Sequence, residues 1–361
     1  MRLSQLSINS VRNLTEANLA CGPGCNIIFG ENAAGKTAVL EAIHILARTS
    51  SFRTHRITEV IQHNQETLSI SAEVCINDKD TRIHTGLEKG RSQTRIRYNG
   101  ERITRRSEQA RNLPLLTVTP DSHRLLFGSP KDRRHWLDWS LFHVKPGYIQ
   151  AWQDYHQALR QRNILLRKAA PPEELIPWEK AMATAAQPLV ASRREYLQQL
   201  QQALGPFLAV DLNQLVIDYT GPELSTEQYQ DKLQRHRKTD SLLGHTQYGP
   251  HRDDVVFYLD ESKNAAGILS RGQAKKLIIA LTLAQAVKYQ EHREQTPILL
   301  LDDLPAELDD QSRAVIHGQI QGQAMQVFIT TTHPETLAHE PGQTATAMFH
   351  VERGQVTKVV E

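Results

Sequence analysis

The chain has 361 residues, of which 39% are hydrophobic and 23% are charged, and its formal net charge is +2. This length predicts two domains, or one large domain with an insertion, and the apolar content is sufficient for a packed core. The near-neutral charge excludes a polycationic protein, so any nucleic-acid surface must be a local patch. No apolar run approaches membrane-spanning length and the N-terminus has no apolar signal core, so we expect a cytoplasmic protein without a membrane partner.

The first predicted elements are a hairpin and a short apolar strand, CNIIF, followed by the segment FGENAAGKT. Gly30, Gly35, Lys36 and Thr37 give this segment the pattern of a phosphate-binding loop, in which backbone N–H groups face the phosphates. Lys36 can reach the β- and γ-phosphates, and the Thr37 hydroxyl can ligate Mg²⁺. The next segment, TAVLEAIHILA, has helical periodicity, which directs a helix N-terminus at the phosphates. The candidate nucleotide-binding residues are Gly30, Glu31, Asn32, Ala33, Ala34, Gly35, Lys36 and Thr37.

Several strand-like segments follow between residues 69 and 119, and Asn99-Gly100 predicts a tight hairpin turn. Arginines concentrate around this turn, and we expect them to bind the phosphates of duplex DNA without sequence specificity. A solvated charged hairpin, partly neutralised by its glutamates, is the alternative. A basic group around Lys131, Arg133 and Arg134 is the second candidate surface. The candidate DNA-binding residues are Arg95, Arg97, Arg105 and Arg106.

From about 131 to 240 the pattern changes to long helices, interrupted at Pro146 and at Pro171-Pro172. The α/β pattern returns after GPHRDDVVFYL and continues to a final hairpin that turns at Arg353-Gly354. We therefore predict a discontinuous head domain, 1–130 and 241–361, with a mainly helical domain inserted at 131–240.

The segment ILLLDDLPAELD, residues 298–309, combines a buried-strand pattern with two adjacent carboxylates. Asp302, at the end of the strand, is the candidate partner of Thr37 in holding Mg²⁺, and Asp303 is the candidate group that polarises the attacking water. Acidic residues at a strand end are common, so a second segment is needed to decide the class of protein.

That segment is LSRGQAKKLIIALTLAQAV, residues 269–287, in which Ser270, Gly272 and Gln273 stand at the start of a long helix. A serine that simply caps the helix is the alternative. Together with the loop and the acidic strand, the spacing matches the signature of ABC-type ATPases, in which the signature of one subunit covers the nucleotide of another. The prediction is an α/β, ABC-type P-loop ATPase head, with Lys36, Ser270 and Asp303 as candidate catalytic residues.

The chain resembles the RecF family of recombination mediators, which are related to SMC-type ATPase heads. The resemblance covers nearly the whole chain and is carried by FGENAAGKTAVLEAI, GSPKDRRHWLDW, QALRQRN, GPHRDD, LSRGQAKKL and LLLDDLPAELDD. It implies an ATP-dependent homodimer that binds duplex or gapped DNA, hydrolyses ATP slowly and acts with RecO and RecR in loading RecA. At the D-loop, Ala306 replaces a residue that often bears a hydroxyl, which leaves Asp309 as the polar member. His333 stands near the switch-histidine position.

Three other functions compete with this one. Asp303 is one methylene shorter than the glutamate of transporters, so a nucleotide-gated DNA-binding scaffold with vestigial hydrolysis is the main alternative. A transporter subunit would need a glutamine loop and a coupling helix, which the inserted block lacks. A coiled-coil SMC-type head would need hundreds of residues between its halves, and about 110 inserted residues are too few.

Overall fold

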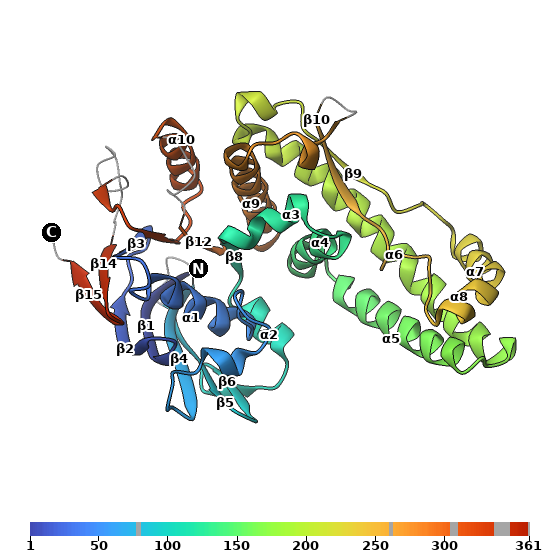
Figure 1. Cartoon of the computed structure of the whole chain (residues 1–361), viewed down its shortest axis with the longest axis horizontal. Helices are drawn as coiled ribbons and strands as arrows, with labels where there is room; N and C mark the ends of the chain where they lie inside the picture. The colour runs from blue at the N-terminus through green and yellow to red at the C-terminus, as the bar shows by residue number, and fades with distance from the viewer. Residues whose placement is uncertain (77–80, 260–262, 304–309, 336–346, 360–361) are drawn as a thin grey trace. The chain divides into compact units, whose positions relative to one another are not determined.

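The computed structural model describes residues 1–76, 81–259, 263–303, 310–335 and 347–359 (Figure 1). The chain divides into two compact units: unit 1 is Met1–Ser122 with Arg271–Glu361, and unit 2 is His123–Ser270. The predicted boundaries, after 130 and after 240, differ from these divisions. Residues 241–270 lie in unit 2 because their strand β10 (Val255–Leu259) pairs with β9 (Val216–Tyr219) from the helical block.

Unit 1 contains a six-stranded antiparallel sheet with the order β2-β1-β4-β5-β6-β7. Along β4 buried and exposed positions largely alternate, as expected when only one face of a sheet packs on the core. The predicted turn at Asn99-Gly100 is confirmed, with φ of 50° and 82° at these two residues. The strands are β1 (Arg2–Val11), β2 (Leu14–Ala20), β4 (Thr67–Ile76), β5 (Thr81–Gly90), β6 (Thr94–Tyr98) and β7 (Glu101–Ile103).

The second sheet of unit 1 has the order β15-β14-β3-β13-β12-β8, and only β15 runs antiparallel to its neighbour. The predicted final hairpin is confirmed, since Arg353 and Gly354 form its turn with φ of 47° and 80°. The strands are β3 (Cys25–Phe29), β8 (Leu115–Val118), β12 (Ile298–Leu301), β13 (Val327–Thr331), β14 (Ala347–Glu352) and β15 (Gln355–Val359).

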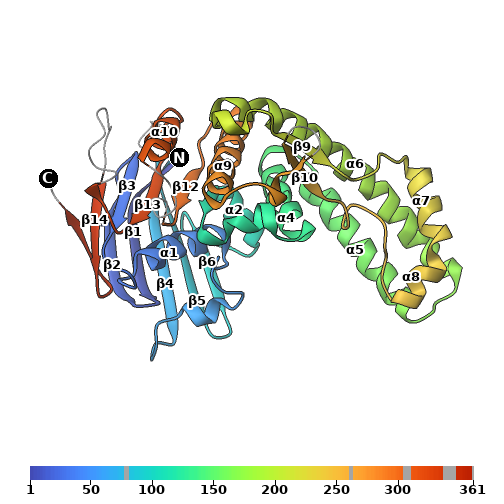
Figure 2. The ribbon, with the colours of Figure 1, turned by 45° about the horizontal axis from the view of Figure 1, so that its top comes forward.

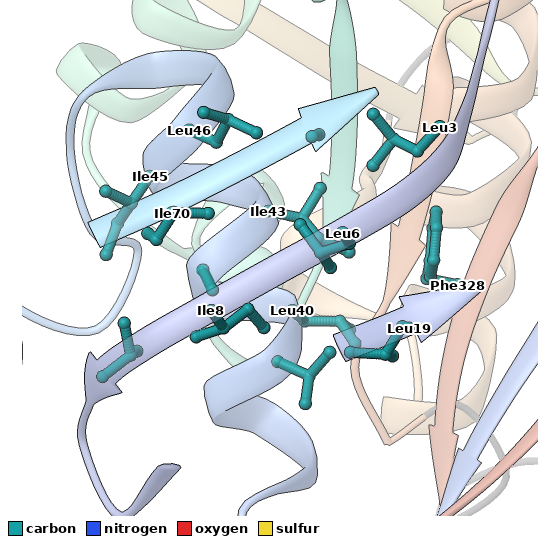
Figure 3. Packing of buried hydrophobic residues seen from close by; sticks show 14 of the residues in the cluster. Leu3, Leu6, Ile8, Leu19, Leu40, Ile43, Ile45, Leu46, Ile70 and Phe328 are labelled. Carbon is teal, nitrogen blue, oxygen red and sulfur yellow. The ribbon is translucent and has the colours of Figure 1, made fainter. Parts of the chain in front are cut away.

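Helix α1 (Lys36–Arg48) lies between these two sheets (Figure 3). Sequence periodicity predicts one apolar face, but every residue from Ala38 to Ala47 is buried, because the antiparallel sheet covers one side and the parallel strands the other. Leu6 of β1, Ile43 of α1 and Phe328 of β13 belong to one continuous core, and each such side chain contributes about 1.5–3 kcal/mol relative to exposure.

The remaining helices of unit 1 are α2 (Arg106–Asn112), α9 (Arg271–Arg293) and α10 (Asp310–Gln321). The long helix predicted after Ser270 is confirmed as α9, although it begins at Arg271, so that Gly272 and Gln273 lie inside its first turn. Within the described part of the chain, no helix is both long enough and apolar enough to cross a membrane.

Unit 2 is built on an antiparallel pair of long helices, α5 (Tyr148–Arg167) and α6 (Pro172–Leu204), which lie side by side in both views (Figures 1 and 2). Both predicted helix breaks, at Pro146 and at Pro171-Pro172, are confirmed. The unit also has a three-stranded sheet of the order β11-β10-β9, in which β11 is Lys263–Asn264. Its other α-helices are α3 (Arg124–Phe127), α4 (Pro130–Val144), α7 (Thr226–Arg235) and α8 (Arg237–Leu243).

The motif QALRQRN provides a fully buried ionic cluster in unit 2. The guanidinium of Arg162 is 0% exposed and contacts Glu179 at 3.2 Å and Asp240 at 2.8 Å. It also donates hydrogen bonds to the Thr246 hydroxyl and the Leu233 carbonyl, at 2.7 and 3.0 Å. A buried charge is tolerated only when paired and hydrogen-bonded in this way, so this motif is explained by architecture.

The motif GPHRDD joins several elements of unit 2. Gly249 has φ of 134°, and a Cβ at this position would lie 1.9 Å from the Tyr229 hydroxyl, so a side chain is excluded. His251 contacts the Tyr155 hydroxyl at 2.6 Å, and Asp253 accepts a hydrogen bond of 2.6 Å from Tyr219. The side chains of this motif therefore form internal contacts of unit 2.

Candidate nucleotide site

The predicted strand–loop–helix arrangement is present between β3 and α1. Gly30 and Gly35 have φ of 153° and 123°, and Ala33 has φ of 65°, so the loop reverses direction within a few residues. The Lys36 amine donates hydrogen bonds of 2.8 Å to the carbonyls of Gly30 and Glu31. These bonds hold the lysine over the loop, where a phosphate group would be bound.

The outer side of the loop is supported by two turns, whose contacts with the loop were not predicted from the sequence. The Asn13 side-chain amide and the Gly354 N–H both donate to the Ala34 carbonyl, each at 2.9 Å. A Cβ on Gly30 would lie 2.1 Å from the Val351 carbonyl oxygen, so the loop also packs directly on β14. No local pattern predicts these contacts, because the turns are distant from the loop in sequence.

The parallel sheet brings the acidic residues to the same edge as the loop. In the sheet register Phe29 pairs with Thr331, and Leu301 pairs with Ile329, so β3, β12 and β13 end side by side. Asp302 directly follows β12, whose four residues are all buried. This edge, at the carboxyl ends of parallel strands, is where such sheets bind ligands.

Two hydroxyls hold the Asp302 carboxylate. Thr37 donates to Asp302 Oδ1 at 3.0 Å, and Thr330, from the end of β13, donates to the same oxygen at 2.8 Å. Burial raises the pKa of Asp302 above its usual value, and the two hydroxyl bonds oppose this rise. The predicted pair of Thr37 and Asp302 is thus in direct contact, whereas Thr330 was missed because it lies 28 residues further along the chain.

Asp303 is exposed and has a positive φ of 55°. Its N–H donates to the Thr330 hydroxyl at 2.8 Å, and its carbonyl accepts a bond of 3.0 Å from the Lys275 amine of α9. Burial lowers the pKa of Lys36, and the negative charges of Asp303 and Asp302 oppose that effect. The lysine and both carboxylates therefore share one electrostatic environment.

The oxygen atoms of Thr37 and Asp302 suit a small hard cation such as Mg²⁺. Among the described residues there is no group of three or more histidine, cysteine, aspartate or glutamate side chains that could hold a metal ion. A site with one or two protein oxygens, completed by phosphate and water, is typical of Mg²⁺-nucleotide centres. The donor set fits that metal, and not a site formed entirely by protein side chains.

The segment with Ser270, Gly272 and Gln273 crosses the division between the two units, since Ser270 ends unit 2 and α9 begins unit 1. His333 is exposed, lies just beyond β13 and contacts Glu335 at 3.1 Å. The D-loop residues, Ala306 and Asp309, lie outside the described residues.

A buried glutamate on α1 was not expected from the sequence. Glu41 is 0% exposed, and Arg12 contacts its two oxygens at 2.8 and 2.9 Å. Ser51 donates a 2.5 Å hydrogen bond to it, and Arg53 lies 3.8 Å away. This cluster joins the β1–β2 turn to the segment after α1, so Arg12 and Arg53 are tied to a structural partner.

The arginines of the β6–β7 hairpin are exposed. Arg95 pairs loosely with Glu88 at 3.4 Å. Arg97 and Arg102 lie directly opposite each other in the register, and among the described residues neither forms an ion pair. Like charges at opposite positions destabilise a sheet, so this pair favours a bound anion. Arg102 was not among the predicted DNA-binding residues.

The other basic candidates lie on helices. Arg105 immediately precedes α2 and Arg106 is its first residue, so they extend from a helix N-terminus and not from the hairpin itself. In unit 2, Arg133 makes two bonds to Asp254, at 2.7 and 2.8 Å, and Arg134 donates to a backbone carbonyl. The second predicted surface is therefore occupied at two of its three residues by internal partners.

Known proteins with similar sequences belong to one family. The chain matches the family described as RecF/RecN/SMC N terminal domain over residues 2–357. It is 39% identical to the DNA replication and repair protein RecF of Stutzerimonas stutzeri (strain A1501), over 99% of this chain and 98% of that protein. It is 35% identical to the protein of the same name from Shewanella loihica (strain ATCC BAA-1088 / PV-4), over 99% of this chain and 100% of that protein.

Two kinds of solved structure share the fold. The recombination mediator protein RecF-ATP in the RecFOR pathway matches with a TM-score of 0.87 at 24% identity, over 99% of this chain and 97% of that one. An Smc head bound to the C-winged helix domain of ScpA matches with a TM-score of 0.60 at 14% identity, over 99% and 97%. Both likenesses show an ABC-type ATPase head fold.

Proposed function

The chain belongs to the RecF family, and from this premise we propose that it is an ATP-dependent DNA-binding recombination mediator. It dimerises on ATP, binds duplex DNA near gaps and, with RecO and RecR, promotes RecA loading in recombinational repair and replication restart in the cytoplasm. The observation that carries this proposal is the contact of the Thr37 hydroxyl with Asp302 at the mouth of an ordered phosphate-binding loop.

Each residue at this edge has a distinct role in the proposal. The loop N–H groups and Lys36 bind the phosphates, while Thr37 and Asp302 hold Mg²⁺, which when bound neutralises phosphate charge during transfer. Asp303 orients and deprotonates the attacking water. Its exposed position suits such a role, because the carboxylate must be reached by solvent and by a second subunit.

ATP-dependent dimerisation follows from the signature segment. Ser270, Gly272 and Gln273 complete the γ-phosphate site of a partner chain through charge-assisted hydrogen bonds. These bonds exist only with ATP, so ATP shifts the monomer–dimer equilibrium by differential binding. Sizing the protein with no nucleotide, ADP, ATP and a non-hydrolysable analogue, with and without duplex DNA, tests this proposal.

Ser270→Arg should bind ATP as tightly as wild type and remain monomeric. A wild-type protein that stays monomeric at saturating ATP and micromolar concentration would exclude the proposed dimer. Measurable phosphate release, lost in Asp303→Asn, separates a cycling ATPase from the scaffold with vestigial hydrolysis.

DNA binding rests on the exposed arginines of the hairpin and of α2. Replacing Arg95, Arg97, Arg105 and Arg106 together by alanine should flatten the salt dependence of DNA affinity by about 0.9 in log–log slope for each DNA phosphate that the variant no longer binds. Nucleotide binding should not change. An unchanged slope and affinity would place the DNA surface elsewhere, with the exposed Lys131 of unit 2 as the next residue to replace.

A further inference from the structure

The peptide of Asp303 is held on both sides by side chains that come from other elements. Its N–H is bonded to the Thr330 hydroxyl at 2.8 Å, and its carbonyl is bonded to the Lys275 amine at 3.0 Å. Between these bonds the residue adopts φ of 55°, in the left-handed region. That conformation is unfavourable for a non-glycine residue, so surrounding contacts are needed to maintain it.

The two holding residues connect Asp303 to different parts of the site. Thr330 also donates to Asp302 Oδ1 at 2.8 Å, and so fixes the relative orientation of the two acidic residues. Lys275 lies in the first turns of α9, five residues after Ser270. The direction of the Asp303 side chain is therefore coupled to the end of β13 and to the start of the signature helix.

Resting on the proposed ATPase function, we propose that Thr330 and Lys275 are positioning residues that hold the Asp303 peptide in its left-handed conformation and so direct its carboxylate at the attacking water. A shift of the first turns of α9, where a partner's nucleotide binds, would move the Lys275 amine and with it Asp303. Contact with a second subunit would then adjust hydrolysis at this chain's own nucleotide.

The first test separates rate from binding. Lys275→Met removes one hydrogen bond to the Asp303 backbone and should lower kcat by on the order of 10-fold. Thr330→Val removes bonds to both Asp303 and Asp302 and should lower kcat at least as much. Lys275→Met should leave the dissociation constant for ATP within about 2-fold of wild type, because the Lys275 amine bonds to the backbone of Asp303, whose side chain acts on water. Thr330→Ser, which keeps the hydroxyl, should restore most of the rate that Thr330→Val removes.

Matched controls exist on α9. Lys288→Met removes a lysine near the C-terminal end of α9, far from Lys275, whose amine pairs with Glu291 three residues later. Thr282→Val removes a buried hydroxyl that donates to the Ile278 carbonyl of its own helix, at 2.7 Å. Both controls should retain the wild-type kcat.

Two further measurements distinguish positioning from loss of structure. In an Asp303→Asn background, Lys275→Met should cause no further reduction of rate, since both residues act through the same carboxylate. Without any nucleotide, hydrogen exchange of the Asp303 amide should be faster in Thr330→Val than in wild type, and unchanged in Thr282→Val.

The results distinguish a failure of the positioning role from a failure of the proposed ATPase function. If Asp303→Asn hydrolyses ATP at the wild-type rate, Asp303 is not the base and the inference falls with that assignment. If Asp303→Asn is slow but Lys275→Met and Thr330→Val match their controls, the ATPase function stands and the positioning role is overturned. Additive reductions in the Asp303→Asn background would likewise overturn it.

Discussion

The buried charge of Arg162 in unit 2 is fully paired with protein groups, whereas the two acidic residues that follow β12 in unit 1 are only partly paired. Arg162 is fully buried with two carboxylates, a hydroxyl and a carbonyl around it. Asp302, by contrast, is held through one oxygen by two threonines, and its neighbour Asp303 is exposed. A charged side chain whose hydrogen bonds and ion pairs are all made within the protein has an architectural role. A carboxylate that keeps free hydrogen-bonding capacity beside a phosphate-binding loop is suited to bind a ligand.

The largest expected effect is at the exposed carboxylate of Asp303. Asp303→Asn should lower the rate of ATP hydrolysis by about 10²–10⁴-fold, the usual contribution of a general base, with ATP binding retained. Lys36→Ala should lose ATP affinity instead, because it removes the charge above the loop. Phosphate release and equilibrium nucleotide binding, measured on both variants, distinguish the two roles.

The expected difference between the two variants, a lower rate in Asp303→Asn and a lower ATP affinity in Lys36→Ala, can be contradicted directly. Equal reductions of affinity in both would mean that Asp303 serves to hold the nucleotide. Neither substitution should change the free energy of unfolding by more than about 1 kcal/mol, because Asp303 is exposed and Lys36 is only partly buried.

Arg162→Met tests the structural role of the buried ionic cluster in unit 2. Removing one partner of a buried ionic cluster costs about 3–5 kcal/mol, since Asp240 loses the cation that it contacts, whereas Glu179 keeps its ion pair with Arg237. All four tryptophans of the chain lie between residues 136 and 178, in unit 2, so tryptophan fluorescence during urea unfolding reports on this unit. Arg160→Met, an exposed arginine on the same helix, should stay within about 0.5 kcal/mol of wild type. A similar stability for both variants would show that the cluster is not structural.

The sequence predicted the loop, the acidic strand and the signature helix because each is a local pattern of residue type and spacing. It did not predict Thr330, Asn13 or Glu41, since their roles depend on which strands become neighbours in the sheets. Thr330 reaches Asp302 only because β12 and β13 pair in parallel. Such long-range register leaves no signal in a window of one helix or strand.

In the fold, too, local elements were predicted correctly, whereas the pairing of distant strands was not. The long helices of unit 2 were predicted from periodicity and from prolines at their ends. The strand β10 lies in the range 241–361 that we predicted to belong to the head, but it pairs with β9 in unit 2. Pairing partners decide domain membership, and a strand's own sequence does not specify them.

A pH dependence of unit 2 is expected from His251. Burial lowers the pKa of this residue to about 4, whereas histidine in an unfolded chain titrates near 6.5. Between these values the unfolded chain binds more protons, so the stability contribution is complete above pH 6.5 and is lost as pH falls toward 4. The difference corresponds to about 3 kcal/mol.

The measurement is the difference between wild type and His251→Gln. Burial raises the pKa of Asp253, which makes folding more favourable at low pH and opposes the histidine effect. Urea unfolding of both proteins from pH 7 to pH 4.5, followed by tryptophan fluorescence, isolates the histidine component. Parallel pH profiles for the two proteins would contradict a buried neutral His251.

The smallest expected effect concerns the support of the loop in unit 1. The Ala34 carbonyl accepts hydrogen bonds from both the Asn13 side chain and the Gly354 N–H. Asn13→Ala removes the first and leaves the second, so the carbonyl keeps a partner and the loop keeps its course. The net value of one such bond is about 1 kcal/mol, which predicts a reduction of ATP affinity of about 5-fold.

Asn18→Ala is the matched control, because the Asn18 side chain lies exposed on β2 and donates to Glu16 within its own strand. It should leave ATP affinity at the wild-type value. A reduction of about 100-fold or more in Asn13→Ala, equivalent to nearly 3 kcal/mol, would mean that the β1–β2 turn does not merely steady the loop but determines its conformation. The nucleotide site would then depend on the antiparallel sheet, which carries Asn13, as strongly as on the parallel sheet, which carries the acidic residues.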